Sequence, residues 1–192
     1  MAFNAVLNSQ SFDEVQVAAS GHGPVGISWT VVTGNGTLSA GTIVALDSNN
    51  KVVPYGETSK ELGTGDGSTT DFTGTFDEYP LQPGTVEVTA GSASLNDDGC
   101  GRLCGDGSGT VNYVTGEVSV SFSSAPASGV TVSATAKRRA FGVLANTIDT
   151  DEETTATVYT HGTVVKDSLL VGGSAAATED VVILAGLGIY AL

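Results

Sequence analysis

Aromatic residues are scarce in this sequence: they make up 6% of its 192 residues, with a single Trp. A hydrophobic core must therefore be built mainly from Val, Ala, Leu and Ile. Basic residues are also few, since 7 Lys and Arg stand against 21 Asp and Glu, and the net charge is −14. Such acidity argues against DNA or RNA binding, because neutralised phosphates supply most of that affinity.

Long apolar runs and helical periodicity are lacking as well. No stretch approaches the roughly 20 apolar residues of a membrane helix, and the N-terminus lacks the basic region and apolar run of a signal peptide. We therefore expect no membrane partner and synthesis in the cytoplasm. The 26 Gly and the many Ser and Thr fit short strands joined by tight turns. The predicted fold class is mainly β, with at most a short helix.

A strand-rich segment at 62–136 separates two stretches that have the pattern of halves of one small domain. A domain accepts such an insertion at an exposed loop tip, because the entropy of loop closure grows only logarithmically with length. We predict an N-terminal arm at 1–26, a discontinuous β-rich domain at 27–61 plus 137–192, and an Ig-like β-sandwich insert at 62–136. This segment has nine acids against one base, a net charge of −8, which suits a soluble outer surface but is equally typical of an ordinary acidic protein.

Alternating apolar positions locate the strands. In residues 117–122, for example, Val118, Val120 and Phe122 share one face of a half-buried strand. A hairpin is predicted around the turn at 47–50, and a short helical turn within 164–171. The predicted strands are 27–32, 42–46, 51–53, 85–90, 93–95, 110–113, 117–122, 130–136, 140–148 and 154–159, with linkers at 60–67 and 137–139.

An ordered series of short patterns runs through the two flanking stretches: Ala45-Leu46-Asp47, then 51–55, 141–144, 158–164 and 167–170. Taken together they resemble the lambda-type head (capsid) decoration proteins of tailed bacteriophages, over about half of the chain. The segment at 62–136 departs from the short loop usual in that family. It resembles a Gly/Thr-rich β module of phage structural proteins, through 65–70, 83–88 and 126–132.

The resemblance implies a capsid decoration (cement) protein that binds and stabilises the mature head lattice, with the insert projecting outward. The implied partners are the major capsid protein and further copies of the chain, as a homotrimer, and the implied location is the outer capsid surface of the virion. The N-terminal arm would contact the capsid through Phe3, Phe12, Val15 and Val17. The alternative is a virion adhesion module that binds host-surface glycans through the insert, where the aromatic residues are Phe72, Phe76, Tyr79 and Tyr113.

Candidate reactive residues are few. Cys100 and Cys104 lack the spacing of a C-x-x-C redox pair, and both a disulfide across a hairpin tip and two free thiols remain open. The oxygen-rich stretches 66–71 and 96–99 suit turns better than calcium, because they lack the spaced ligands of an EF-hand loop. His161 is interpreted as a turn residue. No nucleophile motif or phosphate loop is present, so we expect no enzyme, cofactor or metal site.

Overall fold

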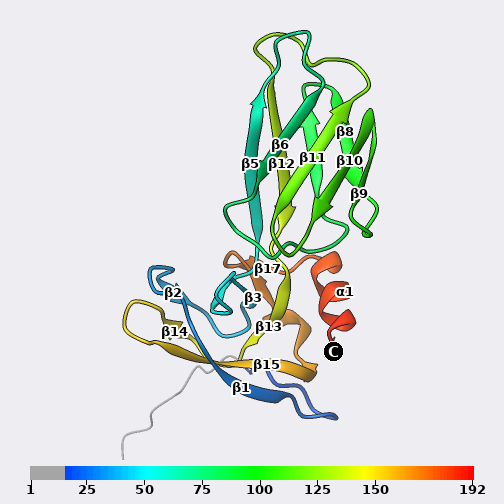
Figure 1. Cartoon of the computed structure of the whole chain (residues 1–192). Helices are drawn as coiled ribbons and strands as arrows, with labels where there is room; N and C mark the ends of the chain where they lie inside the picture. The colour runs from blue at the N-terminus through cyan, green and yellow to red at the C-terminus, as the bar shows by residue number, and fades with distance from the viewer. Residues whose placement is uncertain (1–15) are drawn as a thin grey trace, which may run out of the picture.

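The computed structural model describes residues 16–192, and the fold is mainly β, as predicted. Two separate sheets dominate the molecule, and one stands above the other (Figure 1). We call residues 57–137, which form the upper sheet, the projecting lobe. Residues 16–56 and 138–192 form the base. The only α-helix in the described part of the chain lies in the base, beneath the lobe.

The base is built on a six-stranded sheet with strand order β1-β15-β13-β3-β4, in which β18 pairs in parallel with β15. These strands are β1 (Val25–Thr30), β3 (Ile43–Leu46), β4 (Val52–Pro54), β13 (Ala140–Leu144), β15 (Thr155–Val164) and β18 (Ile189–Ala191). Around them lie β2 (Thr37–Leu38), β14 (Ile148–Asp149), β16 (Leu170–Val171), β17 (Ser174–Ala175), the 3₁₀ turn η1 (Lys166–Ser168) and helix α1 (Thr178–Gly186).

Both faces of the base sheet are covered along β3. Ile43 and Ala45 point into one hydrophobic cluster and Val44 into another, as the two-residue period of a strand requires, and all three are fully buried. Strand β3, before the lobe, pairs antiparallel with β13, after it, through Ala45 and Ala140. The base sheet thus contains strands from both sides of the insertion. The predicted hairpin around 47–50 and the predicted helical turn within 164–171 are confirmed as β3–β4 and η1.

The lobe is a single sheet of eight strands in the order β5-β12-β7-β8-β9-β10-β11-β6. Its strands are β5 (Glu57–Thr64), β6 (Asp71–Thr75), β7 (Glu87–Ala90), β8 (Ala93–Asp97), β9 (Arg102–Gly105), β10 (Gly107–Asn112), β11 (Glu117–Phe122) and β12 (Thr131–Lys137). The two end strands nearly meet. A Cβ added to Gly63 in β5 would lie 3.2 Å from the ring of Phe72 in β6. The sheet is therefore rolled almost closed around its own core.

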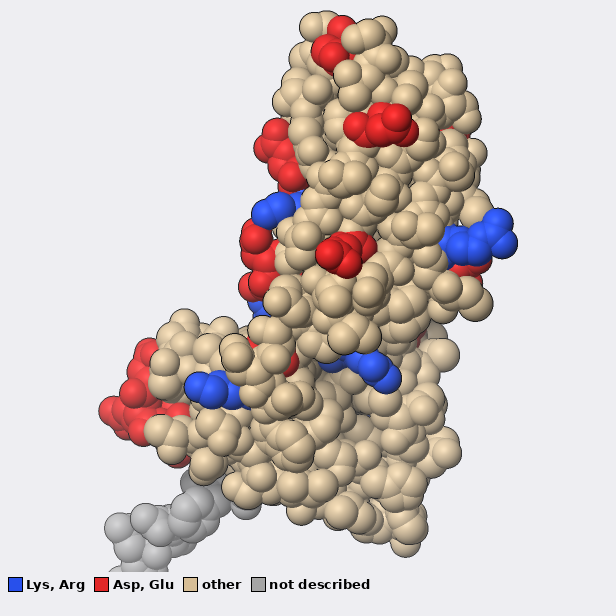
Figure 2. All heavy atoms as spheres, viewed as in Figure 1, with Lys and Arg blue, Asp and Glu red and all other residues tan. Residues whose placement is uncertain are grey.

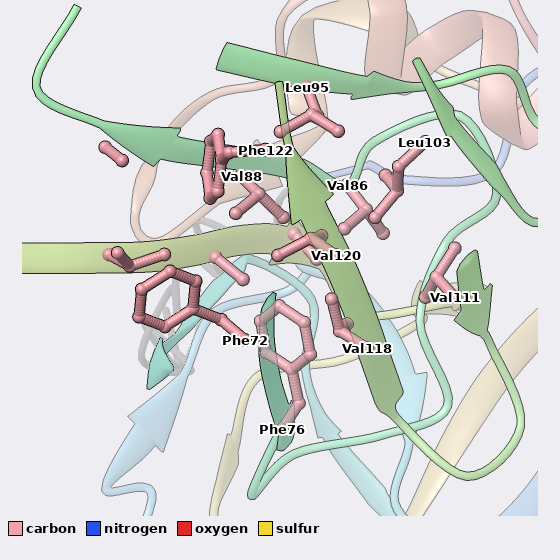
Figure 3. Packing of buried hydrophobic residues seen from close by; sticks show 14 of the residues in the cluster. Phe72, Phe76, Val86, Val88, Leu95, Leu103, Val111, Val118, Val120 and Phe122 are labelled. Atoms are coloured by element: carbon pink, nitrogen blue, oxygen red, sulfur yellow. The ribbon is translucent and has the colours of Figure 1, made fainter. Parts of the chain in front are cut away.

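The lobe core consists of the inward-facing residues of these strands. Phe72 lies in β6 and Phe76 directly follows this strand. In Figure 3, both side chains point toward Val118 and Val120 of β11. The predicted β-rich, sandwich-like lobe is confirmed. Its strands form one rolled sheet, whereas an Ig-like domain has two separate sheets, because every strand from β5 to β6 is hydrogen-bonded to the next.

The predicted linker at 60–67 is wrong for its first half. Strand β5 starts at Glu57, five positions before the predicted start of the insert, and pairs with β12 down to Lys137. Its sequence hides this because only Thr58 is buried, so no apolar alternation is visible. Strands β6 and β9 were not predicted either, since each contributes only one buried side chain, Phe72 and Leu103.

Candidate docking face

Charge is absent from the sheet of the base. None of its six strands contains an Asp, Glu, Lys or Arg residue. In the lobe, every strand except β10 contains at least one. Five of the six strands, all except β4, belong to long uncharged stretches of chain, at 16–46, 140–148, 154–165 and 181–192. The two sheets therefore present chemically different surfaces.

The surface reflects this division. In Figure 2, acidic groups are spread over the lobe, and on the base they gather at the left, where Figure 1 places β2 and β14. The acidic turn at 149–153 lies at this end of the base. Apart from a basic group directly beneath the lobe, the visible lower and right part of the base shows no charged atoms.

Exposed apolar side chains are concentrated in the base. Six of the seven large hydrophobic residues that are exposed in the described chain belong to it: Val25, Ile27, Val182, Leu187, Tyr190 and Leu192. Val25 and Ile27 lie on β1 and are 49% and 41% exposed, and Tyr190, on β18, is 53% exposed. Strands β1 and β18 both pair with β15, so these residues border the same central strand. Apolar groups gathered on an uncharged surface mark an interaction site more often than scattered ones do.

Strand β1 is an open edge of the base sheet. It pairs with β15 on one side, and no strand within residues 16–192 pairs with its other side. Five of its six residues are exposed. Natural proteins usually protect such edges with charged side chains, because unpaired N–H and C=O groups attract other strands. β1 has no such protection, and it lies on the side of the base opposite the lobe (Figure 1). We call β1 and β18, with the exposed apolar residues Val25, Ile27 and Tyr190 that they carry, the docking face.

The segment before β1 runs along the end of β15, the strand with which β1 itself pairs. The N–H of Val165 donates to the carbonyl of Val17 at 2.8 Å, and Ala18 bridges to Val164. Val17 is 2% exposed and packs in the base core, so its side chain is not exposed on the surface, and its contact with a capsid stays a prediction. Phe3, Phe12 and Val15, the other predicted capsid contacts, lie outside the described residues.

The two histidines meet beside this edge. His161 lies within β15 and pairs with Val25, so the interpretation of His161 as a turn residue is wrong. Its ring stands edge-on to that of His22, with the ring centroids 5.3 Å apart. No local pattern in the chain indicates this pair, because 138 residues separate its members. The pairing of 18–25 with β15 brings them together.

The remaining candidate residues serve local structure. Cys100 and Cys104 are exposed free thiols at the β8–β9 hairpin of the lobe. Asp66 accepts the N–H groups of Ser68 and Thr69, and these hydrogen bonds hold the pKa of its carboxyl below the ordinary range. Such bonds are those of a turn that its own side chain stabilises. Within residues 16–192, no three His, Cys, Asp or Glu side chains are placed to share a metal ion.

The comparisons with known proteins identify no relative. No family model matches the chain, and neither the curated proteins nor the solved structures contain a match to it. Among the described residues, no helix is both long and apolar enough to cross a membrane.

The docking face was missed by sequence reasoning although one signal was visible. Counting charges by segment shows the uncharged stretch 16–46 directly, whereas net charge and composition of the whole chain hide it. What no count could supply is the assembly of 16–46, 154–165 and 181–192 into one sheet. That assembly depends on pairings between distant residues, such as Val25 with His161, which are 136 positions apart.

Proposed function

We propose that this chain is a decoration protein of a tailed-phage head, which binds the assembled shell through the docking face of its base and holds the lobe outward. The division of charge between the two sheets carries the proposal. A surface meant to stay in water benefits from net charge, whereas a surface meant to be buried against a partner is depleted of charge at its centre.

The position of the docking face supports the same arrangement. Strand β1 lies opposite the lobe, so a partner at β1 leaves the lobe free to project. An open edge without charged residues can accept a strand from a partner protein, and main-chain hydrogen bonds then supply affinity. The partner would be the major capsid protein, and residues 1–15, which lead into this edge, would extend the contact.

The proposed effect on the shell is thermodynamic. A subunit that binds the mature lattice and not its dissociated parts stabilises that lattice by mass action. A homotrimer, as the family resemblance implies, would multiply the effect, because linked copies bind with a high effective concentration. The site of action would be the outer surface of the virion.

A matched pair of substitutions tests the docking face. Ile27→Glu places a charge on β1, and Val114→Glu places the same charge on the lobe, where Val114 is 68% exposed. Burying an Ile side chain contributes about 1.5–3 kcal/mol, so Ile27→Glu should weaken binding to undecorated heads at least about tenfold. Val114→Glu should bind as the wild type does. Occupancy is measured by sedimenting heads with the protein and quantifying the bound fraction.

The fluorescence of Trp29, the only Trp, reports folding of the base, since its indole N–H donates to the carbonyl of Asn50 at 2.6 Å. Wild-type occupancy by a folded Ile27→Glu variant would contradict the docking face. Failure of the wild type to bind heads at all would refute the proposed function itself.

The alternative, glycan binding through the lobe, lacks an aromatic platform. Phe72 and Phe76 are buried in the lobe core, and Tyr79 and Tyr113 are packed against it. The hydroxyl of Tyr113 is already used, since it donates to Asp97 at 2.6 Å and accepts the N–H of Gly101. No observation in the described residues favours this second function.

A further inference from the structure

The lobe joins the base through only two crossing points of the chain. These are the start of β5 at Glu57 and the end of β12 at Lys137, and the two residues pair with each other. The N–H of Arg138 continues the pairing by donating to the carbonyl of Gly56 at 2.9 Å. An isolated ribbon of two strands resists bending within its plane, but it bends easily toward either face because no third layer packs against it. The connection alone would leave the lobe free to swing.

Two consecutive cations lie at this ribbon. Lys137 Nζ lies 2.7 Å from Asp180 Oδ1, in helix α1 of the base. Arg138 pairs with Glu78 of the lobe, and its guanidinium also donates to the carbonyl of Pro54 at 2.7 Å. Successive residues of a strand point to opposite faces. The two ion pairs therefore lie on opposite sides of the ribbon.

The contact on the α1 side is well built. Asp180 is 3% exposed, and its Oδ1 also accepts the hydroxyl of Tyr55, itself 1% exposed, at 2.9 Å. Its second oxygen accepts the N–H of Ala177 at 3.1 Å. The ammonium of Lys137 also lies 5.8 Å from the centre of the Tyr55 ring. A pair held by this many fixed partners loses less to side-chain entropy than a surface pair does.

We propose that Lys137 and Arg138 strap the lobe to the base from both faces of the ribbon, so that the lobe keeps one orientation. Each strap resists bending toward the opposite face, because that motion would separate its ion pair. Further hydrogen bonds close the junction: the N–H of Gln82 donates to the carbonyl of Lys137, and that of Arg139 donates to the carbonyl of Pro80, both at 2.8 Å. The lobe then acts as a rigid projection. This inference holds whatever the base binds.

The chain supplies the probes for a direct test. Trp29 is its only Trp and lies in the base, while Cys100 and Cys104 are exposed on the lobe. In a Cys104→Ser background, an energy acceptor on Cys100 reports the distance from Trp29. Time-resolved energy transfer gives the distribution of that distance. We expect a narrow distribution for the strapped protein, and a distribution about twofold broader in the double variant Lys137→Met with Arg138→Met.

Lys60→Met is the matched control. It removes an ion pair of the same type, Lys60 with Asp77, that lies wholly within the lobe, and it should leave the distribution unchanged. Circular dichroism and Trp29 emission verify folding, and the single variants replace the double one if that fails to fold. A folded variant with the wild-type width would overturn the proposal, as would a broad distribution in the protein that carries both straps.

Discussion

At the scale of single residues, Gly41 occupies a position that only glycine fits. Its φ of +86° lies in the left-handed region, and a Cβ there would stand 1.9 Å from the carbonyl oxygen of Ser168. Both backbone groups of Gly41 are in use, since its N–H donates to Leu144 and its carbonyl accepts from Leu170. This close approach joins the chain just before β3 to the end of η1.

Gly41→Ala should therefore destabilise the base by more than about 3 kcal/mol, because strain and a backbone clash add together. Gly34→Ala is the control: its φ is +91°, but nothing lies within 4 Å of the added Cβ. It should cost only about 1–2 kcal/mol, the strain of a left-handed alanine. Urea unfolding followed by Trp29 emission measures both, and equal losses would show that the clash is relieved elsewhere.

Val17 illustrates why single contact residues were hard to predict. The alternation in 12–17 is real, but alternation fits an edge strand, an arm bound to a partner and a core-facing segment equally well. Val164 and Val165, which lie far along the chain, pair with this segment, and this pairing places Val17 in the core.

At the scale of elements, helix α1 is tied to the strands by one buried carboxylate. Asp180 is the only charged residue in 16–192 that is almost fully buried. Burial would raise its pKa, but hydrogen bonds from Lys137 and Tyr55 and the charge of Lys137 outweigh this, so the pKa lies below the ordinary 3.8. Desolvation, the hydrogen bond to Asp180 and the nearby carboxylates raise the pKa of Tyr55, so its hydroxyl stays protonated as a donor. The attachment of α1 is therefore stable at neutral pH.

Because the pKa of Asp180 is lower in the folded than in the unfolded chain, ionised Asp180 adds stability above about pH 4 and loses this effect as the pH falls through the folded-state value. Asp180→Asn should reduce the free energy of unfolding at pH 7 by about 1–3 kcal/mol. At pH 2 the difference between variant and wild type should shrink. Urea denaturation at both values measures it, and Glu179→Gln, on the exposed neighbour 3.6 Å from Lys137, should show little effect. An equal gap at both values would exclude Asp180 as the titrating group.

Element prediction succeeded where burial alternates and failed where it does not. Strand β11 alternates perfectly between exposed and buried residues and was predicted at its exact bounds, 117–122. Strand β5 is longer, yet only one of its eight residues is buried. Strand β5 forms because its backbone pairs with β12 along 131–137, and no local sequence pattern indicates this pairing.

At the scale of the whole molecule, the base should fold without the lobe. Since Glu57 and Lys137 are paired, an Asn-Gly turn can replace residues 58–136 and close a hairpin while keeping Lys137 beside Asp180. We expect a soluble protein with wild-type Trp29 emission that still binds heads.

In the matched comparison, the same Asn-Gly turn replaces residues 62–136, which are the insert as predicted from sequence. It leaves residues 58–61 of β5 without their partners in β12, and it should be less stable or aggregate through the unpaired edge. Equal stability of the two shortened chains would mean that residues 58–61 of β5, without their partners, do not lower the stability of the base. Unfolding of both would show that the base depends on the lobe.

The sequence by itself determined the mainly β class, the alternating core strands and the tight turns, because these depend on neighbours within a few residues. It also determined where charge is absent, since 16–46 contains no Asp, Glu, Lys or Arg in any fold. Only the tertiary structure decided that these uncharged stretches share one sheet, that β1 is left open, and that Lys137 and Arg138 face opposite sides of one ribbon. The reason is physical: strand pairing joins residues far apart in the chain, and its register is set by the packing of both faces together.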